Sequence, residues 1–339
     1  MGSESRNRYL LKNTLIFTLG NIGSRMISFF LIPLYTNVLT TSQYGTVDLI
    51  TTISTVAGPM LTLNIAESVM RFGLDKDADK EKNTQCGSIV LLIAMIIGLV
   101  LIPICRCITE VSDYAMYVYF YVISLSASQL FLCDLRGKEL LLKYSLGNIL
   151  QTLMIAILNI TFLLVFKMET GGYLLAYIIA NFIVAIYAII AGKGYKAFSF
   201  HNIDRCKLKE MIRYSVVLIP NTFMWWIMNS SDRVMVTYMI GAAANGIYAV
   251  SYKLPTLVST LTGIFNQAWS YSAIREEGTS DETEYNNKMF KTLSAIAFMM
   301  GIGLLLLTKP FLGVYVADSY YDAWKYTPFL IIGCVYLTD

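Results

Sequence analysis

Charged residues are scarce in this chain. They make up 14% of its 339 residues, whereas apolar residues make up 56% and the mean hydropathy is +0.57. A soluble globular chain carries about 25% charged residues, so this chain has too few to cover a surface that faces water. The same composition excludes a disordered tail and a collagen-like fibre. The net charge of +3 gives no indication of a nucleic-acid partner. We therefore expect lipid to surround much of the protein.

Histidine and paired cysteines are also lacking. His201 is the only histidine, and the six cysteines form no CxxC pair. A histidine-based zinc site or a Ser-His-Asp triad would need partners that the chain does not offer. Most of the cysteines lie in apolar runs, where small buried thiols are the simple interpretation. The sequence predicts no enzyme, no metal site and no cofactor.

Long apolar runs dominate what is present. A hydrocarbon core about 30 Å thick needs about 20 apolar residues as a helix. Runs such as 89–104 lack the period-two alternation of a spanning strand. Helices satisfy their own backbone hydrogen bonds inside lipid. The sequence therefore predicts nine membrane helices and the start of a tenth, at 10–36, 44–70, 86–105, 114–135, 144–166, 172–192, 214–240, 246–272, 290–308 and 326–338.

The distribution of lysine and arginine predicts the orientation. With the N-terminus in the cytoplasm, 19 of the 26 Lys and Arg residues fall in inside segments, 4 in outside segments and 3 within helices. This is a strong positive-inside bias. The apolar stretch after the polar N-terminus is too long for a signal-peptide core. We expect it to be a retained first membrane helix with its start in the cytoplasm.

A basic loop at 193–213 separates the first six predicted helices from the rest. A weak internal repeat agrees with this boundary, since a shift of 201 residues places Gly246 on Gly45 and Ile240 on Leu39. Transporters are commonly built from such halves. We expect an N-lobe at 1–192, a cytoplasmic linker at 193–213 and a partial C-lobe at 214–339. The second lobe is expected to be truncated, because the repeat implies six helices in each half.

Charged residues in the interiors of the predicted helices are confined to the first two helices of each half, since Asp134 lies at the inner boundary of 114–135. These interior residues are Arg25, Asp48, Glu67, Asp232, Arg233 and Lys253. Charge inside a membrane is costly, so we expect these four helices to surround one polar cavity. Glu67 and Arg71 also have the i, i+4 spacing of a helical salt bridge.

Neutral polar residues accompany these charges at helical spacing. In the first helix, one face carries Thr14, Thr18, Asn21, Arg25 and Ser28. The segment 214–240 carries a looser stripe of Asn221, Trp225, Asn229 and Asp232. Hydrogen bonding between helices would also explain such stripes. For Arg25, an ion pair with Asp48 or Asp232 is the structural alternative to a ligand-binding role.

The segment 17–55, FTLGNIGSRMISFFLIPLYTNVLTTSQYGTVDLITTIST, resembles the opening of the Wzx-like oligosaccharide flippases of bacterial polysaccharide biosynthesis. The turn 241–254, GAAANGIYAVSYKL, resembles the corresponding region of the second half. These flippases are grouped with the MATE drug exporters in the multidrug/oligosaccharidyl-lipid/polysaccharide exporter superfamily. The resemblance implies an all-α, polytopic, MATE-like membrane helix bundle of two six-helix lobes in a bacterial plasma (inner) membrane.

The resemblance also implies a substrate, an undecaprenyl-diphosphate-linked oligosaccharide that is flipped from the cytoplasmic to the outer leaflet by alternating access. Cations suit the diphosphate, and hydroxyls and amides suit the sugars. We expect substrate-binding residues at Arg25, Asn21, Ser28, Asn229, Arg233 and Lys253. The buried acids Asp48, Asp232 and Glu67 are expected to carry H⁺ or Na⁺. Membrane lipids and other polysaccharide-assembly proteins are the expected partners.

Two alternatives remain at this stage. A MATE-type, cation-coupled exporter of drugs or metabolites would share the fold but favour an acidic, aromatic cavity. Three basic residues against two or three acids favour an anionic substrate. A polymerase or ligase of the same pathway would need a large extracytoplasmic loop, and a glycosyltransferase would need a nucleotide-binding domain. The longest predicted outside loop, 309–325, is too short to hold a catalytic domain.

Overall fold

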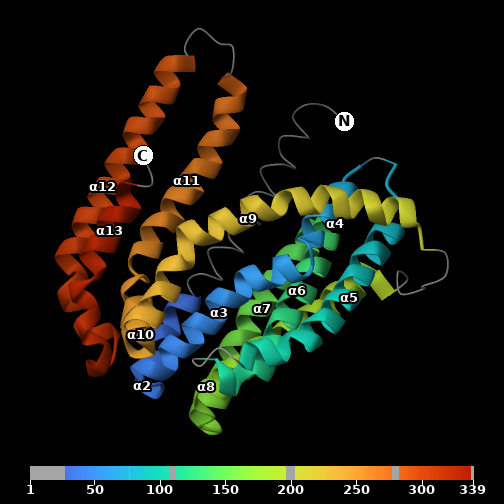
Figure 1. Cartoon of the computed structure of the whole chain (residues 1–339). Helices are drawn as coiled ribbons and strands as arrows, with labels where there is room; N and C mark the ends of the chain where they lie inside the picture. Colours follow the sequence, from blue (N-terminus) through green and yellow to red (C-terminus); the bar gives the residue numbers. More distant parts are fainter. Residues whose placement is uncertain (1–26, 76, 107–110, 196–202, 277–281, 337–339) are drawn as a thin grey trace.

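The computed structural model describes residues 27–75, 77–106, 111–195, 203–276 and 282–336. Every regular element in these ranges is helical (Figure 1), which confirms the all-α class. Most of the predicted helix at 10–36 lies outside the described residues, although 27–38 is helical. The other predicted segments all correspond to helices.

The helices of the first half are α2 (Ile32–Val38), α3 (Thr41–Leu61), α4 (Ile65–Gly73), α5 (Lys80–Arg106), α6 (Ala115–Gly137), α7 (Leu141–Ile160) and α8 (Glu169–Ala191). A π-helical turn, Thr161–Val165, extends α7. Those of the second half are α9 (Arg205–Met239), α10 (Ala242–Ser251), α11 (Pro255–Glu276), α12 (Glu282–Tyr315) and α13 (Thr327–Tyr336). Short 3-10 helices cover Ser112–Tyr114 and Asp318–Lys325.

Five helices in the described ranges are long and apolar enough to cross a membrane. They are Lys80–Pro103, Ser112–Gly137, Leu141–Val165, Glu169–Ala191 and Asn286–Tyr315. The bent pair α3 and α4 would make a sixth. The predicted spans at 214–240 and 246–272 are helical but are not among them, because α9 and α11 carry more polar residues than these helices. Within the described residues, length and composition thus support five or six spans, and the predicted span at 10–36 lies mostly outside those residues.

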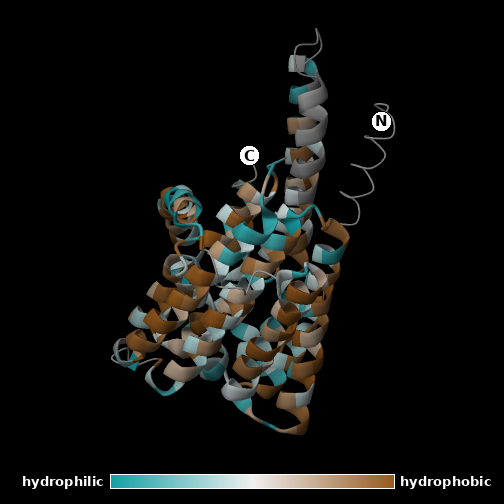
Figure 2. Cartoon of the chain, turned by 90° about the vertical axis from the view of Figure 1, so that its right-hand side faces the viewer, coloured by the Kyte–Doolittle hydropathy of each residue, from teal (hydrophilic) through white to brown (hydrophobic). Residues whose placement is uncertain are grey.

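The outer faces of these helices are apolar, as Figure 2 shows along most of their length. On α5, Ile96 and Val100 lie one turn apart and are 66% and 70% exposed. Contiguous exposed apolar faces of this kind are uncharacteristic of a protein surrounded by water. Their place on helices long enough to span a bilayer indicates a multi-pass membrane protein.

Two predicted helices are broken, which corrects the sequence analysis. The segment 44–70 bends by 60° between α3 and α4, where Leu63 and Asn64 adopt φ values of 53° and 56°. This left-handed conformation is costly for most residues but is tolerated by asparagine. The segment 246–272 breaks before Pro255, which has no backbone N–H and begins α11.

The long helix α9 begins earlier than predicted. Its N-cap is Asp204, whose carboxylate accepts a hydrogen bond from the Lys207 backbone N–H at 3.0 Å. Residues 205–213 of the predicted basic linker are therefore helical. Side chains also connect α9 to the first half of the chain: Ser68 donates to the Met211 carbonyl at 2.9 Å, and the Trp226 indole donates to the Thr52 carbonyl at 2.9 Å. The division into lobes stays a prediction.

The predicted halves meet where α3 packs against α10. A Cβ on Gly45 would lie 1.8 Å from the Ala242 carbonyl oxygen, and a Cβ on Gly246 would lie 2.0 Å from the Thr41 carbonyl oxygen. The two contacts are related by the same shift of 201 residues that relates the glycines. This reciprocal approach, here called the glycine contact, is what a two-fold relation between repeats would produce.

The last three helices form a group of their own beside this contact. Figure 1 shows α11, α12 and α13 (orange to red) standing apart from α4 to α8. Their core consists of Val258, Ala297, Ile331 and Val335. The 3-10 helix Asp318–Lys325 connects them to the first half, because the Tyr320 hydroxyl donates to the Leu39 carbonyl at 3.0 Å. The contact between α3 and α10 is therefore bordered by helices from both ends of the chain.

Candidate functional site

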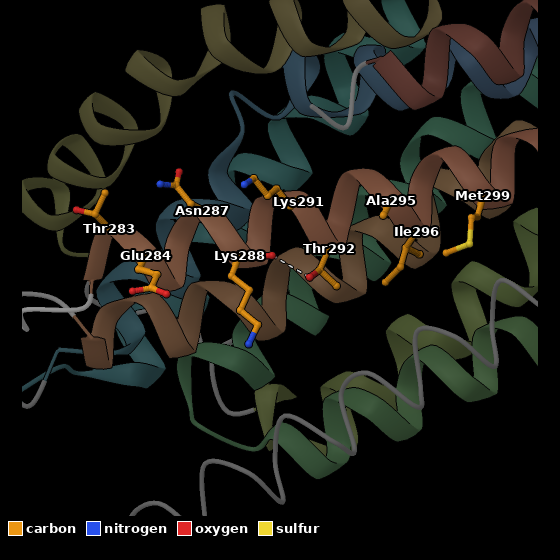
Figure 3. A pocket seen from close by; sticks show the side chains of 9 residues that line it. All are labelled: Thr283, Glu284, Asn287, Lys288, Lys291, Thr292, Ala295, Ile296 and Met299. Atoms are coloured by element: carbon orange, nitrogen blue, oxygen red, sulfur yellow. Dashed lines mark hydrogen bonds between the residues drawn. The ribbon is translucent and has the colours of Figure 1, made fainter.

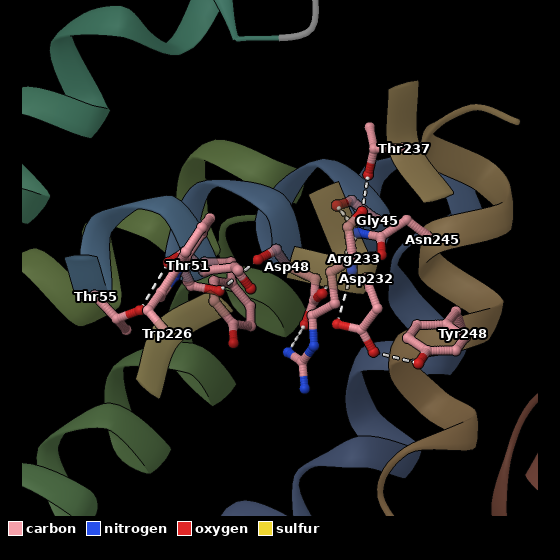
Figure 4. Close-up of polar contacts among 12 residues, drawn as sticks. Gly45, Asp48, Thr51, Thr55, Trp226, Asp232, Arg233, Thr237, Asn245 and Tyr248 are labelled. Carbon is pink, nitrogen blue, oxygen red and sulfur yellow. Dashed lines mark hydrogen bonds and ion pairs between the residues drawn. The ribbon is translucent and has the colours of Figure 1, made fainter. Parts of the chain in front are cut away.

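A buried ion pair joins α3 to α9. Asp48 lies in the second turn of α3, and Arg233 lies near the end of α9. Their Oδ1 and Nη1 atoms are 2.9 Å apart, and the side chains are 7% and 18% exposed. Figure 4 shows the guanidinium reaching from α9 toward the carboxylate. Because the two residues come from opposite sides of the predicted boundary, the pair connects the two halves of the chain.

Residues of α10 complete this site. The Asn245 amide donates to the Gly45 carbonyl at 2.9 Å and contacts Asp48 Oδ2 at 3.4 Å. The Tyr248 hydroxyl donates to the carboxylate of Asp232 (Figure 4). We call the group of Asp48, Asp232, Arg233, Asn245 and Tyr248 the α3–α9–α10 site.

Arg233 retains donors beyond its ion pair. A guanidinium has five N–H donors, and the structure gives it a single carboxylate, through Nη1. Its Nε is buried and has no hydrogen-bond partner within the described residues. The guanidinium also packs over the Tyr252 ring, with Cζ 5.2 Å from the centroid. The guanidinium therefore keeps N–H donors that its ion pair with Asp48 does not use.

Four residues predicted to act together meet here or nearby. Asp48, Asp232 and Arg233 belong to the site, and Lys253 follows at the break between α10 and α11. Lys253 is half-buried and interacts electrostatically with Arg233 and Asp48. In the described part of the chain, no carboxylate lies within 4 Å of its ammonium group.

The other predicted residues lie elsewhere. Arg25 and Asn21 fall outside the described residues. Ser28 is exposed on the helical segment 27–38. Asn229 is exposed, and its amide donates to the Trp225 carbonyl in its own helix at 2.7 Å. Their predicted roles in substrate binding stay predictions.

One ion pair differs from the prediction. Arg71 pairs with Asp75, at 2.6 Å between Nη1 and Oδ1, rather than with Glu67. Asp75 lies one turn beyond Arg71, outside the membrane segment that was considered. Asp48 is paired with Arg233, and its considered partner Arg25 lies outside the described residues, so an Arg25 ion pair stays a prediction. Glu67 instead faces a cavity.

This cavity has a volume of about 740 Å³ and lies between the α3–α4 break, α6, α7 and α9. We call it the amide cavity, because five of its lining side chains are amides. Its lining consists of Pro59, Asn64, Ala66, Glu67, Leu125, Ser128, Gln129, Leu132, Cys133, Tyr144, Asn148, Gln151, Tyr214, Leu218, Asn221 and Thr222. Neither Arg233 nor Lys253 belongs to this lining. The amide cavity is therefore not the cationic one that the sequence predicts.

A second hollow, of about 960 Å³, runs along α12 (Figure 3). Its lining residues all come from that single helix, from Thr283 to Met299. One helix face does not enclose a ligand, so we assign no site to it.

Sequence reasoning missed Asn245, Tyr248 and the amides of α6 and α7. The predicted site residues were chosen from helices that carry charge. Gln129 and Asn148 are uncharged and lie on helices outside that set. A signal was present, since Ser128 and Gln129 on α6 share one face with Leu125 and Leu132 at helical spacing. Asn245 directly precedes Gly246, which the internal repeat relates to Gly45. The repeat therefore indicated this part of α10 but did not single out Asn245.

Comparisons with known proteins agree on the family and the fold. The chain matches the polysaccharide biosynthesis protein family over residues 10–274. No curated protein matches it in sequence. Among solved structures, it is similar to an outward-facing multidrug resistance MATE transporter of the MOP superfamily, with a TM-score of 0.58, 14% identity, and coverage of 97% of this chain and 79% of that one.

Two further MATE structures have comparable likeness. A mutant of the Vibrio cholerae MATE transporter VcmN matches with a TM-score of 0.54, 14% identity, and coverage of 99% and 81%. A MATE in complex with MaD3S matches with a TM-score of 0.55, 14% identity, and coverage of 97% and 79%. At these identities the likeness shows the fold alone. The chain therefore belongs to the polysaccharide biosynthesis protein family and is a multi-pass membrane transporter with a MATE-like fold.

Proposed function

We infer that this protein flips an undecaprenyl-diphosphate-linked oligosaccharide from the cytoplasmic to the outer leaflet of a bacterial plasma membrane. The family supports a role in polysaccharide biosynthesis, and the fold supports alternating access. The observation that carries the proposal is Arg233, a partly buried cation whose buried Nε has no hydrogen-bond partner in the described residues, at the junction of α3, α9 and α10. A planar guanidinium binds two phosphate oxygens at once.

The diphosphate would bind between Arg233 and Lys253. Lys253 supplies an ammonium group with no carboxylate within 4 Å in the described residues, and Arg25 is proposed as a third cation. Charge-assisted hydrogen bonds of this kind are about twice as strong as neutral ones. The sugars would then contact neutral polar side chains.

Binding of the anion would also couple transport to a gradient. The diphosphate competes with Asp48 for Arg233, so the carboxylate loses part of its ion pair. A buried carboxylate without its partner favours uptake of a proton or Na⁺. Asp232 already accepts a hydrogen bond from Tyr248, so Asp48 is the better candidate for the residue that takes up the proton or Na⁺. Glu67 is the third.

The charge distribution supports a cytoplasmic N-terminus. In that orientation the glycine contact lies toward the outer leaflet, where α3 begins and α9 ends. The described conformation would then be closed on the outer side. Opening that side would require α3 to separate from α10 and the Asp48–Arg233 pair to break.

Deletion of the protein in its own cells tests the function. The lipid-linked glycan should accumulate with its sugars facing the cytoplasm. Arg25→Ala should fail to restore export while still inserting in the membrane. Arg25→Lys should restore part of it, because lysine keeps the charge but loses the planar fork. Normal export by Arg25→Ala would remove Arg25 from the binding site.

A MATE-type exporter of organic cations is the second candidate, since the similar solved structures are MATE transporters. It predicts that deletion leaves the lipid-linked glycan unchanged and makes the cells more sensitive to cationic drugs. The ion pairing of Asp48 argues against it, because that acid is already neutralised by Arg233.

A further inference from the structure

The amide cavity is suited to a ligand unlike a diphosphate. Its lining side chains include five amides, two hydroxyls and two tyrosines, and Glu67 is the one charged residue among them. An anion would meet this carboxylate and no lining cation, so repulsion would oppose its binding. The nearest cation on α6, Arg136, packs over the Tyr144 ring, with Cζ 5.5 Å from the centroid, and does not line the cavity.

Several of these amides have no partner. The side chains of Gln129, Asn148 and Asn221 make no hydrogen bond within the described residues, and none of the three is buried. Other polar groups of the lining are already satisfied, since Gln151 donates to Asn181 at 2.6 Å and Asn64 donates to Thr222 at 3.2 Å. The cavity therefore combines fixed polar groups with amides that can still donate and accept.

Two helices present part of this lining at regular spacing. Tyr144, Asn148 and Gln151 follow one face of α7, and Tyr214, Leu218 and Asn221 follow one face of α9. The break at Leu63 and Asn64 brings Glu67 of α4 to the same space. A volume of about 740 Å³ is within the usual range of a small-molecule site.

We propose that the amide cavity binds the sugar portion of the substrate, while Arg233 and Lys253 bind its diphosphate. The inference rests on the proposed function and assigns separate parts of the substrate to separate places. A saccharide offers many hydroxyls and no net charge, which matches amides that both donate and accept. The Tyr214 ring and the face of the Tyr144 ring that Arg136 does not cover provide apolar surface for sugar rings.

The two places lie on the same helix. Thr222 in the cavity lining and Arg233 are 11 residues apart on α9, or about 16 Å at 1.5 Å per residue. Trp226 lies between them, fixed by its hydrogen bond to the Thr52 carbonyl. A glycan attached to a diphosphate at Arg233 would have to extend over about this distance along α9 to reach Asn221 and Asn148.

The test compares two lipids on the purified full chain in nanodiscs. One is undecaprenyl diphosphate bearing a neutral disaccharide, and the other is undecaprenyl diphosphate alone. The test variant combines Gln129→Met with Asn148→Leu, which keep side-chain size and leave no hydrogen-bond partner behind. The matched control is Asn287→Leu, an exposed amide on α12. Binding is followed by calorimetry and folding by the unfolding temperature.

The double variant should bind the disaccharide lipid about tenfold more weakly, because two amides together supply on the order of 1.4 kcal/mol. Its affinity for the bare lipid, and both affinities of Asn287→Leu, should stay unchanged. Equal loss for both lipids, or no loss for either, would overturn the sugar site. The sugar site would also be overturned if the double variant bound tetraphenylphosphonium more weakly than the wild type but bound the disaccharide lipid equally well. That result would indicate a cation site.

The wild-type result separates this inference from the function itself. If the wild type binds both lipids equally tightly, the sugar site is wrong but the diphosphate site stands. If it binds neither lipid, the proposed function fails and the sugar site fails with it.

Discussion

Asp48 and Arg233 stabilise each other in a place that is largely shielded from water. Their side chains are 7% and 18% exposed, and the ion pair is supported by the Asn245 amide. Removing one member of a buried pair costs about 3–5 kcal/mol, because the other charge is left without a partner. Replacing both members with neutral residues costs much less.

We therefore expect Arg233→Gln to lower the free energy of unfolding by about 3 kcal/mol, at the low end because the guanidinium is partly accessible. Asp48→Asn should have a similar effect. The double variant should recover most of the loss, measured by thermal unfolding in detergent. A double variant as unstable as the sum of the singles would show that the two residues are not coupled.

Single residues also show how far the sequence could be interpreted. The helices that carry buried charge could be identified, because charge within apolar segments is conspicuous. The partners could not, since Asp48 and Arg233 are 185 residues apart. Only the packing of α3 against α9 brings Arg233 beside Asp48. Uncharged lining residues such as Asn148 gave no comparable signal.

At the scale of elements, the glycine contact limits how α3 and α10 can pack. A methyl group on Gly45 would overlap the Ala242 carbonyl, so the helices would have to separate. The opposite glycine has the reciprocal contact with Thr41. The same contact also places Asn245 where its amide reaches the Gly45 carbonyl.

Gly45→Ala and Gly246→Ala should each destabilise the protein by about 1–3 kcal/mol, the usual cost of overpacking. Gly303→Ala on α12 is the matched control, because nothing lies within 4 Å of its Cβ position. It should be neutral or stabilise by up to about 1 kcal/mol. Thermal unfolding of the three variants checks this. A neutral Gly45→Ala beside a damaging Gly246→Ala would contradict the reciprocal contact.

Helix breaks were predictable only in part. Pro255 indicates a boundary, since the residue before a proline is disfavoured in a helix. The break at Leu63 and Asn64 has no proline after it and depends on two left-handed residues. The breaks also do not follow the shift of 201 residues, because positions 264 and 265, which correspond to Leu63 and Asn64, lie within α11. The repeat therefore relates the glycines but not the bends.

At the scale of the whole molecule, the orientation in the membrane is testable with the protein's own cysteines. Cys206 is exposed in the first turn of α9, and Cys105 is partly exposed at the end of α5. The positive-inside bias places these two positions on opposite sides of the membrane. The assignment of every loop to the cytoplasmic or the outer side depends on this orientation.

In intact cells, a membrane-impermeant maleimide should label a variant that keeps only Cys105 and should miss one that keeps only Cys206. Permeabilised cells should label both, which controls for reactivity. Labelling of Cys206 from outside would reverse the orientation and would place the glycine contact toward the cytoplasm.

The overall architecture was the most predictable level. Apolar runs and the resemblance of 17–55 and 241–254 led to the MATE-like fold that the structure confirms. The architecture follows from composition, because an apolar run of about 20 residues satisfies its backbone hydrogen bonds in lipid by forming a helix. The polarity of α9 is the exception, since it reflects contacts with α3 and α4 that a hydropathy pattern does not reveal.

Reconstitution in proteoliposomes tests the central claim most directly. The protein should move undecaprenyl diphosphate bearing a disaccharide between leaflets, measured as the fraction of sugar accessible to an external glycosidase over time. Arg25→Ala should abolish this movement, and the folded Asp48→Asn/Arg233→Gln double variant should lose it too, because both lack cations for the diphosphate. Movement of the glycolipid no faster than in empty liposomes, together with gradient-driven uptake of an organic cation, would contradict the account.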